Sequence, residues 1–336
     1  MSDVENRGRI TMELVSMGVF IMDMFPSETG KRLVEVPAYI PTPGGAMANV
    51  AVAAARLGLK SAFIGKVGDD AFGHYLADII KREGVDSRGL RFDRKARTTM
   101  NFHAKLQGGV IEYLFYRNPG ADTTLRIDEL DTELIQGAKV LHFDSLCLTD
   151  EPMRSTMLEA IHLAERSGAV VSFDVNYRPV LWETPGDFVR CVFDTLPKVD
   201  IVKLNDEELI LVCPGKETED AAAELVERGP KLCLVTRGSE GSYFRTKIGG
   251  CFIPAFDVEV KDTIGCGDAF IGGFLTRMIK EGLRPDTASP EKIADMVRYA
   301  DTVAALTATK YGGLPALPLS EEVEMLYKGR RDACGQ

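Results

Sequence analysis

Residues 262–274 read Asp262-Thr263-Ile264-Gly265-Cys266-Gly267-Asp268-Ala269-Phe270-Ile271-Gly272-Gly273-Phe274. Two glycines stand between a strand-like segment at 256–260 and a helical pattern, and glycines at such a turn let backbone amides approach a ligand closely. Because the start of the helix lies directly behind them, the stretch predicts an anion hole that needs no Lys or Arg. Asp268 is expected in the first turn, beside the anion. The alternative is that Asp268 only caps the helix and interacts with its dipole.

The chain around this stretch predicts an α/β fold. From about Lys139 onward, short apolar runs alternate with helical patterns, and the runs at 140–143, 169–174, 200–204 and 232–236 lack polar alternation. Such runs are typical of parallel strands covered on both faces. With right-handed crossovers they predict a three-layer sandwich around a central, mostly parallel sheet. Ligands of these sheets bind beyond the carboxyl ends of the strands.

Two regions interrupt this alternation and predict a second, smaller sheet. Residues 31–40 have the period of two expected for a strand, and residues 98–117 are expected to form two strands that turn at Gly108-Gly109. A small sheet with segments near 26–42 and 96–120 would form a lid over the α/β core or a dimer surface. The residues leave both open.

Polar residues near the ends of the apolar runs are the other candidates for chemistry. Gly44 and Gly45 precede an Ala-rich helix, in which Asn49 would bind a hydroxylated ligand or a loop carbonyl. Asp23 ends the apolar run 15–22, where a carboxylate would bind two sugar hydroxyls or start a turn. Residues 174–178 and 236–241 likewise follow runs, and Asn205 and Glu208 have the spacing of a capping box.

The composition excludes several classes of protein. The chain has 336 residues, and 40 Lys and Arg against 50 Asp and Glu give a net charge of −10, which disfavours nucleic acid as a partner. Its seven cysteines have no CxxC spacing, so neither disulfides nor a zinc site are expected. This cysteine pattern favours a reducing, cytoplasmic location. The apolar stretch 12–25 contains two acidic residues, so neither a secretory signal nor a membrane span is expected. Walker, HExxH, GxSxG, protein-kinase and strand-borne GxGxxG motifs do not occur in the sequence.

Together, these segments resemble the ribokinase-like (phosphofructokinase-B type) carbohydrate kinases, from about Gly18 to Pro318. The resemblance depends on Gly44-Gly45-Ala46 with Asn49 and on Asp262-Thr263 through Gly265-Cys266-Gly267-Asp268. Further matching segments are Asn205-x-x-Glu208, Thr236-Arg237-Gly238 with Gly241, and residues 65–73. The resemblance implies one ribokinase-like kinase domain over residues 10–318, followed by a C-terminal helix and tail at 319–336.

Within that family the sequence is most similar to fructokinases, through residues 18–23, 116–122 and 174–182. Kinases of 2-keto-3-deoxygluconate share much of the last segment. The sequence departs from the pattern at Val19, where fructokinases usually have Glu, and at Cys266, where Ala is usual. It departs again at Asp301-Thr302-Val303, where an Asn-Ala pair is common.

The resemblance implies phosphoryl transfer from ATP to a primary sugar hydroxyl, with Asp268 as the base and the amides of Gly265, Cys266 and Gly267 as the anion hole. Asn205 and Glu208 would orient Mg²⁺ through water. A monovalent cation, K⁺, is expected near Asp262 and Ile264. The implied sugar-binding residues are Asp23, Gly44, Gly45, Asn49 and Arg178, and the implied ATP-binding residues are Lys203, Asn205, Thr236, Arg237, Gly238, Gly241 and Gly267.

Three functions are therefore open at the level of the sequence. The first is a fructokinase, and the family resemblance also makes a homodimer through the lid sheet possible. The second keeps the fold and Asp268 but acts on 2-keto-3-deoxygluconate, ribose or a nucleoside. The third is a non-catalytic regulator that binds a sugar or a nucleotide. The intact Asp268 and Gly265-x-Gly267 argue against the third, because a binding protein needs no base.

Overall fold

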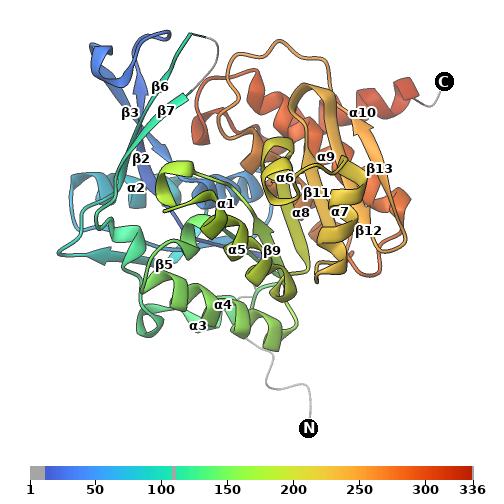
Figure 1. The fold of residues 1–336 in the computed structure, drawn as a ribbon, viewed down its shortest axis with the longest axis horizontal. Helices are drawn as coiled ribbons and strands as arrows, with labels where there is room; N and C mark the ends of the chain where they lie inside the picture. The colour runs from blue at the N-terminus through green and yellow to red at the C-terminus, as the bar shows by residue number, and fades with distance from the viewer. Residues whose placement is uncertain (1–11, 108–110, 335–336) are drawn as a thin grey trace.

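The apolar runs form a nine-stranded sheet at the centre of the computed structural model, which describes residues 12–107 and 111–334. Its neighbouring strands are parallel except for the two pairings at one edge, β11 with β12 and β12 with β13, which are antiparallel. The four strands expected from the sequence are β8 to β11, so this part of the prediction is confirmed. In spatial order the strands are β13 (Gly249–Pro254), β12 (Gly241–Thr246), β11 (Leu232–Thr236), β10 (Ile201–Asn205), β9 (Val170–Asp174), β8 (Val140–Asp144), β1 (Leu14–Met17), β4 (Ser61–Gly68) and β5 (Asp86–Asp93) (Figure 1).

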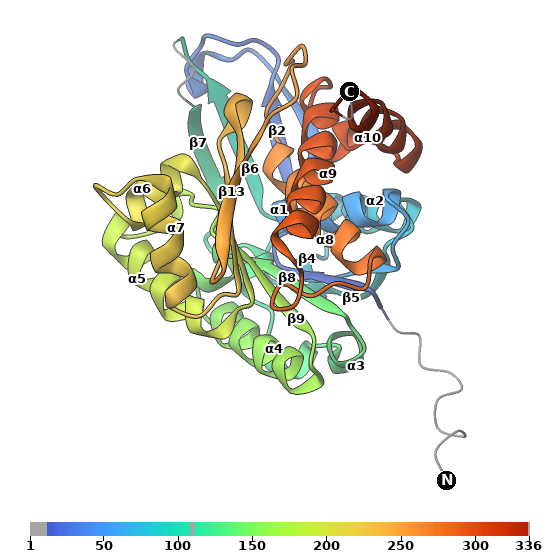
Figure 2. The ribbon, with the colours of Figure 1, turned by 90° about the vertical axis from the view of Figure 1, so that its right-hand side faces the viewer.

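Helices cover both faces of this sheet, which confirms the three-layer α/β prediction (Figure 2). Consecutive strand residues belong to opposite layers: Val140 packs into one apolar cluster and Leu141 into the other. One layer contains α1 (Ala46–Arg56), α2 (Ala71–Arg82), α8 (Cys266–Lys280), α9 (Pro290–Ala308) and α10 (Ser320–Cys334). The other contains α3 (Thr132–Gln136), α4 (Met153–Ser167), α5 (Pro185–Thr195), α6 (Asp206–Val212) and α7 (Thr218–Glu227). None of the helices described is long and apolar enough to cross a membrane.

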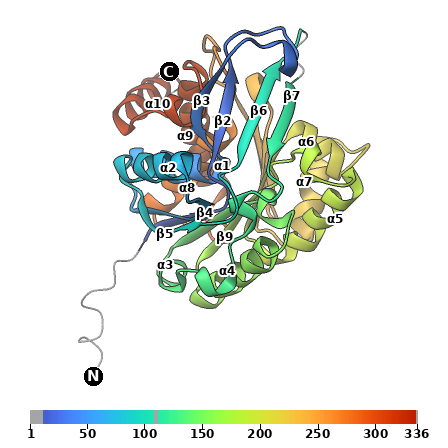
Figure 3. The same cartoon turned by 90° about the vertical axis from the view of Figure 1, so that its left-hand side faces the viewer.

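A four-stranded sheet stands over the central sheet (Figure 3). Its order is β3 (Tyr39–Gly44), β2 (Ile21–Pro26), β6 (Met100–Lys105) and β7 (Ile111–Tyr116). The two strands expected within 98–117 are therefore confirmed, while their predicted turn at Gly108-Gly109 lies outside the described residues.

The strand predicted at 31–40 is mostly wrong. A single 3-10 turn, Leu33–Glu35, occupies its middle, and β3 begins only at Tyr39. Two carboxylates explain the difference, since Glu35 accepts from the amide of Arg32 at 3.0 Å and Glu112 accepts from that of Leu33 at 2.9 Å. These backbone groups thus have side-chain partners in place of a strand ladder.

Two other sequence predictions need correction. The apolar run 15–22 is divided between β1 of the large sheet and β2 of the small one, so Asp23 lies inside β2 and not after a strand. The strand expected at 256–260 is irregular backbone. This segment leaves the edge strand β13 at Pro254 and is attached elsewhere, because the Lys261 amide donates to the Ala308 carbonyl at the end of α9 (2.8 Å).

Candidate active site

A cavity of about 280 Å³ lies between the small sheet and the carboxyl-terminal side of the central sheet. Residues of β2, β6 and β7 line it from one side, and the starts of α1 and α8 and the end of β10 line it from the other. It brings together most of the residues predicted for chemistry: Asp23, Gly45, Asn49, Arg178, Lys203, Asn205, Glu208, Ile264, Gly265, Gly267 and Asp268.

Asp268 lies in the first turn of α8 and is bonded across the cavity wall to α1. The Asn49 side-chain amide donates to Asp268 Oδ2 at 2.7 Å. The residue that caps α8 is Gly265, which has no side chain to accept a hydrogen bond from the helix. The carboxylate of Asp268 accepts its hydrogen bond from Asn49 instead. Burial raises the pKa of Asp268, although the Asn49 hydrogen bond and the charges of Lys203 and Arg178 oppose the rise. The carboxylate is thus desolvated and held in one orientation.

The turn before Asp268 presents backbone amides, as the two glycines predict. Gly265 has φ +81°, a left-handed conformation that favours glycine, and a Cβ there would lie 2.9 Å from Gly313 Cα. Within the described part of the chain, no backbone acceptor is found for the amides of Gly265, Gly267 and Asp268. The amide of Cys266, in contrast, donates to the Thr263 carbonyl at 3.3 Å. Cys266 does not line the cavity, and burial raises the pKa of its thiol to about 12.

Asp23 and its neighbours form the opposite wall. Asn101 on β6 donates to Asp23 Oδ1 at 2.8 Å, and the two residues are register partners in the small sheet. Burial raises the pKa of Asp23 to about 6, against the Asn101 hydrogen bond and the charge of Arg178. Gly44 does not line the cavity, but a Cβ there would overlap Asp23 Oδ2, so the carboxylate needs a glycine at this position.

Arg178 supplies positive charge to several carboxylates around the cavity. It lines the cavity, donates to the Tyr177 carbonyl at 2.9 Å, and opposes the raised pKa values of Asp23, Asp144 and Asp268. Asp144 is fully buried behind the wall, and burial raises its pKa to about 6.

Lys203 places a second cation beside Gly267. Its Nζ lies 2.9 Å from Asp174 Oδ2, and a Cβ on Gly267 would lie 2.9 Å from it. Burial lowers the pKa of Lys203, but the carboxylates of Asp174, Glu208 and Asp268 outweigh this and raise it. The lysine is therefore a permanent positive charge.

Asn205 and Glu208 form the predicted capping box at the start of α6. Asn205 Oδ1 accepts from the Glu208 amide at 2.8 Å, and Glu208 accepts from the amides of Asn205 at 2.8 Å and Tyr177 at 2.7 Å. Both side chains line the cavity, and both carry oxygen atoms that could bind a cation. Among the residues described, no group of three or more His, Cys, Asp and Glu side chains is arranged to hold a metal ion by itself.

The remaining predicted residues lie outside the cavity. Thr236 ends β11 beside Asn205 of β10, and the other predicted nucleotide residues, Arg237, Gly238 and Gly241, continue from it along the same edge of the sheet. Asp262 holds its loop in place, because its carboxylate accepts from the amides of Ile264 at 3.2 Å and Gly312 at 2.9 Å.

Sequence reasoning missed several cavity residues. Asn101 and His103 come from β6, and Tyr113 and Phe115 from β7, whereas Asn176, in the loop after β9, lies within the predicted segment 174–178. Asn101 and His103 could have been found from the strand predicted within 98–117, because residues two apart in a strand share one face.

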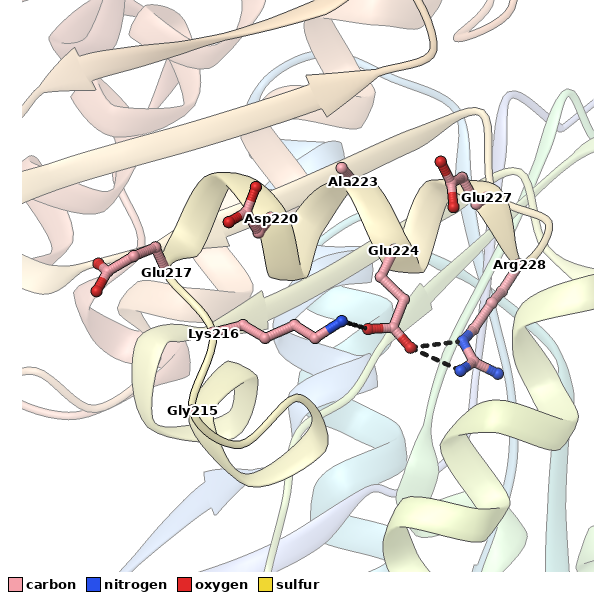
Figure 4. Close-up of a pocket in the computed structure, with 8 residues that line it drawn as sticks. All are labelled: Gly215, Lys216, Glu217, Asp220, Ala223, Glu224, Glu227 and Arg228. Carbon is pink, nitrogen blue, oxygen red and sulfur yellow. Dashed lines mark hydrogen bonds and ion pairs between the residues drawn. The ribbon is translucent and has the colours of Figure 1, made fainter.

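A second hollow, beside α7, shows no comparable convergence (Figure 4). Lys216 and Arg228 both pair with Glu224, so these charges are engaged with one another. No residue predicted for chemistry lines it.

Comparisons with known proteins agree with the fold. The family model of the pfkB family carbohydrate kinases matches residues 12–319. The chain is 39% identical to a probable fructokinase-4 of Arabidopsis thaliana over 94% of this chain and 97% of the relative. It is 40% identical to a fructokinase of Solanum tuberosum over 94% and 96%.

Solved structures give the same result. A fructokinase with bound ATP from Xylella fastidiosa superposes with a TM-score of 0.87 at 31% identity, over 96% of this chain and all of that one. A fructokinase from Vibrio cholerae O395 in a form with fructose, ADP and calcium bound gives 0.84 at 30% identity, over 94% and 98%.

Proposed function

The chain belongs to the pfkB family of carbohydrate kinases, and from that premise we propose that it is an ATP-dependent fructokinase, which converts D-fructose and ATP to fructose 6-phosphate and ADP. The observation that carries this proposal is the position of Asp268. The carboxylate is half-buried at the first turn of α8, in the same cavity as Asp23. Relatives of 39–40% identity named fructokinase support fructose as the sugar.

Asp268 acts as the general base in this proposal. As the primary hydroxyl oxygen of the sugar attacks the γ-phosphorus, its proton passes to the carboxylate of Asp268, and the bond to the bridging oxygen of ADP breaks. The Asn49 hydrogen bond fixes the orientation of this carboxylate. Its raised pKa makes it a stronger proton acceptor than an exposed aspartate.

The anion hole stabilises the charge that gathers on the transferred phosphoryl group. The amides of Gly265, Gly267 and Asp268 have no backbone acceptor within 12–107 and 111–334, so they remain available to phosphate oxygens. The family resemblance implies the amide of Cys266 in this set as well, and that amide would first have to leave the Thr263 carbonyl. Lys203 and Arg178 add fixed positive charge to the same cavity. Preorganised charge in a desolvated site typically contributes more to catalysis than the general base does.

The nucleotide and the cations would lie along the edge from Gly267 to Gly241. Asn205, Thr236, Arg237, Gly238 and Gly241 follow one another on that edge, next to Lys203. Asn205 and Glu208 offer the oxygen ligands that Mg²⁺ prefers, and they would hold it through water while it neutralises phosphate charge. K⁺ would lie near Asp262 and Ile264, where it would help to shape the anion hole.

A substrate panel tests the proposed function. ADP release is measured with Mg-ATP and K⁺ on fructose, 2-keto-3-deoxygluconate, ribose, glucose, mannose and adenosine. We expect fructose to give the highest kcat/KM. A higher value for another sugar would replace the substrate and keep the fold and the base. A folded protein that acts on none of them would support the non-catalytic regulator instead.

A further inference from the structure

The strand β6 divides its side chains between two environments. Phe102 faces away from the cavity and packs edge-on against Tyr39, with ring centroids 5.0 Å apart. Asn101 and His103, one residue to each side, both line the cavity. The small sheet therefore presents a row of polar side chains to the cavity, at positions where a simple lid would need only apolar ones.

Two polar atoms in this row are without partners. Asn101 is 7% exposed and His103 is 5% exposed. Neither Asn101 Oδ1 nor His103 Nε2 has a hydrogen-bond partner among the residues that the structure describes. Buried polar side-chain atoms are nearly always satisfied, so two such atoms on neighbouring positions of one cavity wall indicate a ligand with hydroxyl groups.

The environment of each side chain defines what it can bind. Asn101 gives its amide hydrogen to Asp23 Oδ1, which leaves its Oδ1 as an acceptor beside the Asp23 carboxylate. Two neighbouring acceptors suit two hydroxyl donors. The ring of His103 is held edge-on against Phe25, with centroids 4.5 Å apart. Burial lowers the pKa of His103 to about 4, so at neutral pH the ring is uncharged and has one donor and one acceptor nitrogen.

We propose that Asn101 and His103 are sugar-binding residues of the lid, which bind hydroxyl groups of the substrate other than those bound by Asp23 and so determine which sugar is accepted. The inference rests on the proposed function, since it assigns residues of this same cavity. A site built to bind a hydroxyl rejects a sugar that lacks it, because its buried polar group is then left without a partner.

The first test is direct binding of fructose, by calorimetry without ATP. Asn101→Leu and His103→Phe keep similar size and remove the polar atoms. We expect each to raise the dissociation constant for fructose at least tenfold, with the KM for ATP and kcat little changed, because an interaction made before the transition state affects binding alone. Phe102→Leu, on the opposite face of the same strand, is the matched control and should bind fructose as the wild type does. His103→Gln, which returns an amide near the position of Nε2, should restore part of the affinity.

Monodeoxy fructoses separate contact from an indirect effect. If Asn101 binds one hydroxyl of the sugar, the wild type and Asn101→Leu should bind the analogue that lacks this hydroxyl with equal affinity. A different analogue should remove the difference in affinity between the wild type and Asp23→Asn. An equal loss of affinity for every analogue, or the same analogue for both residues, would overturn the inference for Asn101. For His103, a His103→Phe variant that binds like the wild type would overturn it.

The substrate panel keeps the two proposals apart. If the wild type prefers another sugar, the fructokinase proposal fails, and the variants are measured on that sugar. If fructose is preferred and both variants bind it normally, the lid inference fails alone. A wild-type chain that binds no sugar overturns both.

Discussion

Acidification is expected to weaken fructose binding through protonation of Asp23. Burial raises the pKa of this carboxyl to about 6, which is within an accessible pH range. Protonation removes the negative charge and turns one of the two oxygens into a donor, so the group no longer offers two strong acceptors to a sugar diol. At pH 5 roughly one molecule in ten would carry the ionised group, so the affinity should be about tenfold lower than at pH 8, or about 1.4 kcal/mol.

Calorimetric titration of fructose into the protein from pH 5 to 8, without ATP, measures this effect. The wild-type dissociation constant should rise below about pH 6, with proton release on binding at pH 5.5 in two buffers of different ionisation enthalpy. Asp23→Asn should bind weakly at pH 8 and show little dependence on pH.

Asp144 provides the control. Burial also raises its pKa to about 6, but it does not line the cavity. Asp144→Asn should therefore retain the pH dependence of fructose binding. A flat wild-type profile would refute the role of Asp23, and so would an Asp144→Asn variant that loses the dependence while Asp23→Asn keeps it.

Three further predictions follow from the same cavity and its surroundings. Gly44→Ala places a Cβ against Asp23 Oδ2 and should raise the fructose dissociation constant at least tenfold. Gly186→Ala is the control and should not change this constant, because its Cβ would lie 3.6 Å from the nearest atom, Thr184 Oγ1. The pKa of Asp144 in the folded protein exceeds its ordinary value, so the folded state retains a proton between about pH 4 and 6 that the unfolded chain releases, and stability falls as the pH rises over that range. Urea unfolding should then show Asp144→Asn exceeding the wild type by about 1 kcal/mol at pH 4.5 and by about 3 kcal/mol at pH 8; an equal difference at both pH values would contradict this. Replacing K⁺ by tetramethylammonium should lower kcat about tenfold, and Asp262→Ala should abolish that sensitivity; a rate independent of K⁺ in the wild type would remove the cation from the site.

The sequence was sufficient for the large sheet because its strands are buried on both faces. Runs such as 169–174 and 232–236 have no polar alternation, and within a series of alternating strands and helices this pattern is specific to buried parallel strands. It was insufficient for residues 31–40, because period two there results from alternating exposure in a turn whose amides bind Glu35 and Glu112. Glu112 is 79 residues from Leu33 in the chain, and no local pattern reveals such a partner.

The cavity could be predicted where a motif is local. Gly265, Gly267 and Asp268 are close together in the chain, and the start of a helix brings them together. The pairings of Asn49 with Asp268 and of Asn101 with Asp23 span 219 and 78 residues. They depend on how α1 packs on α8 and on the register of β2 with β6, which only the assembled structure defines.

Single-turnover transfer of labelled γ-phosphate from ATP to fructose, by the wild type and by Asp268→Asn, tests whether Asp268 is the base, provided that fructose binding is measured on both proteins. We expect Asp268→Asn to bind fructose within a few-fold of the wild type and to transfer phosphate at least a hundredfold more slowly. A variant that transfers phosphate at a near-normal rate would contradict this role, because Asp268 would then be no base, and its bond to Asn49 would serve only to join α1 and α8.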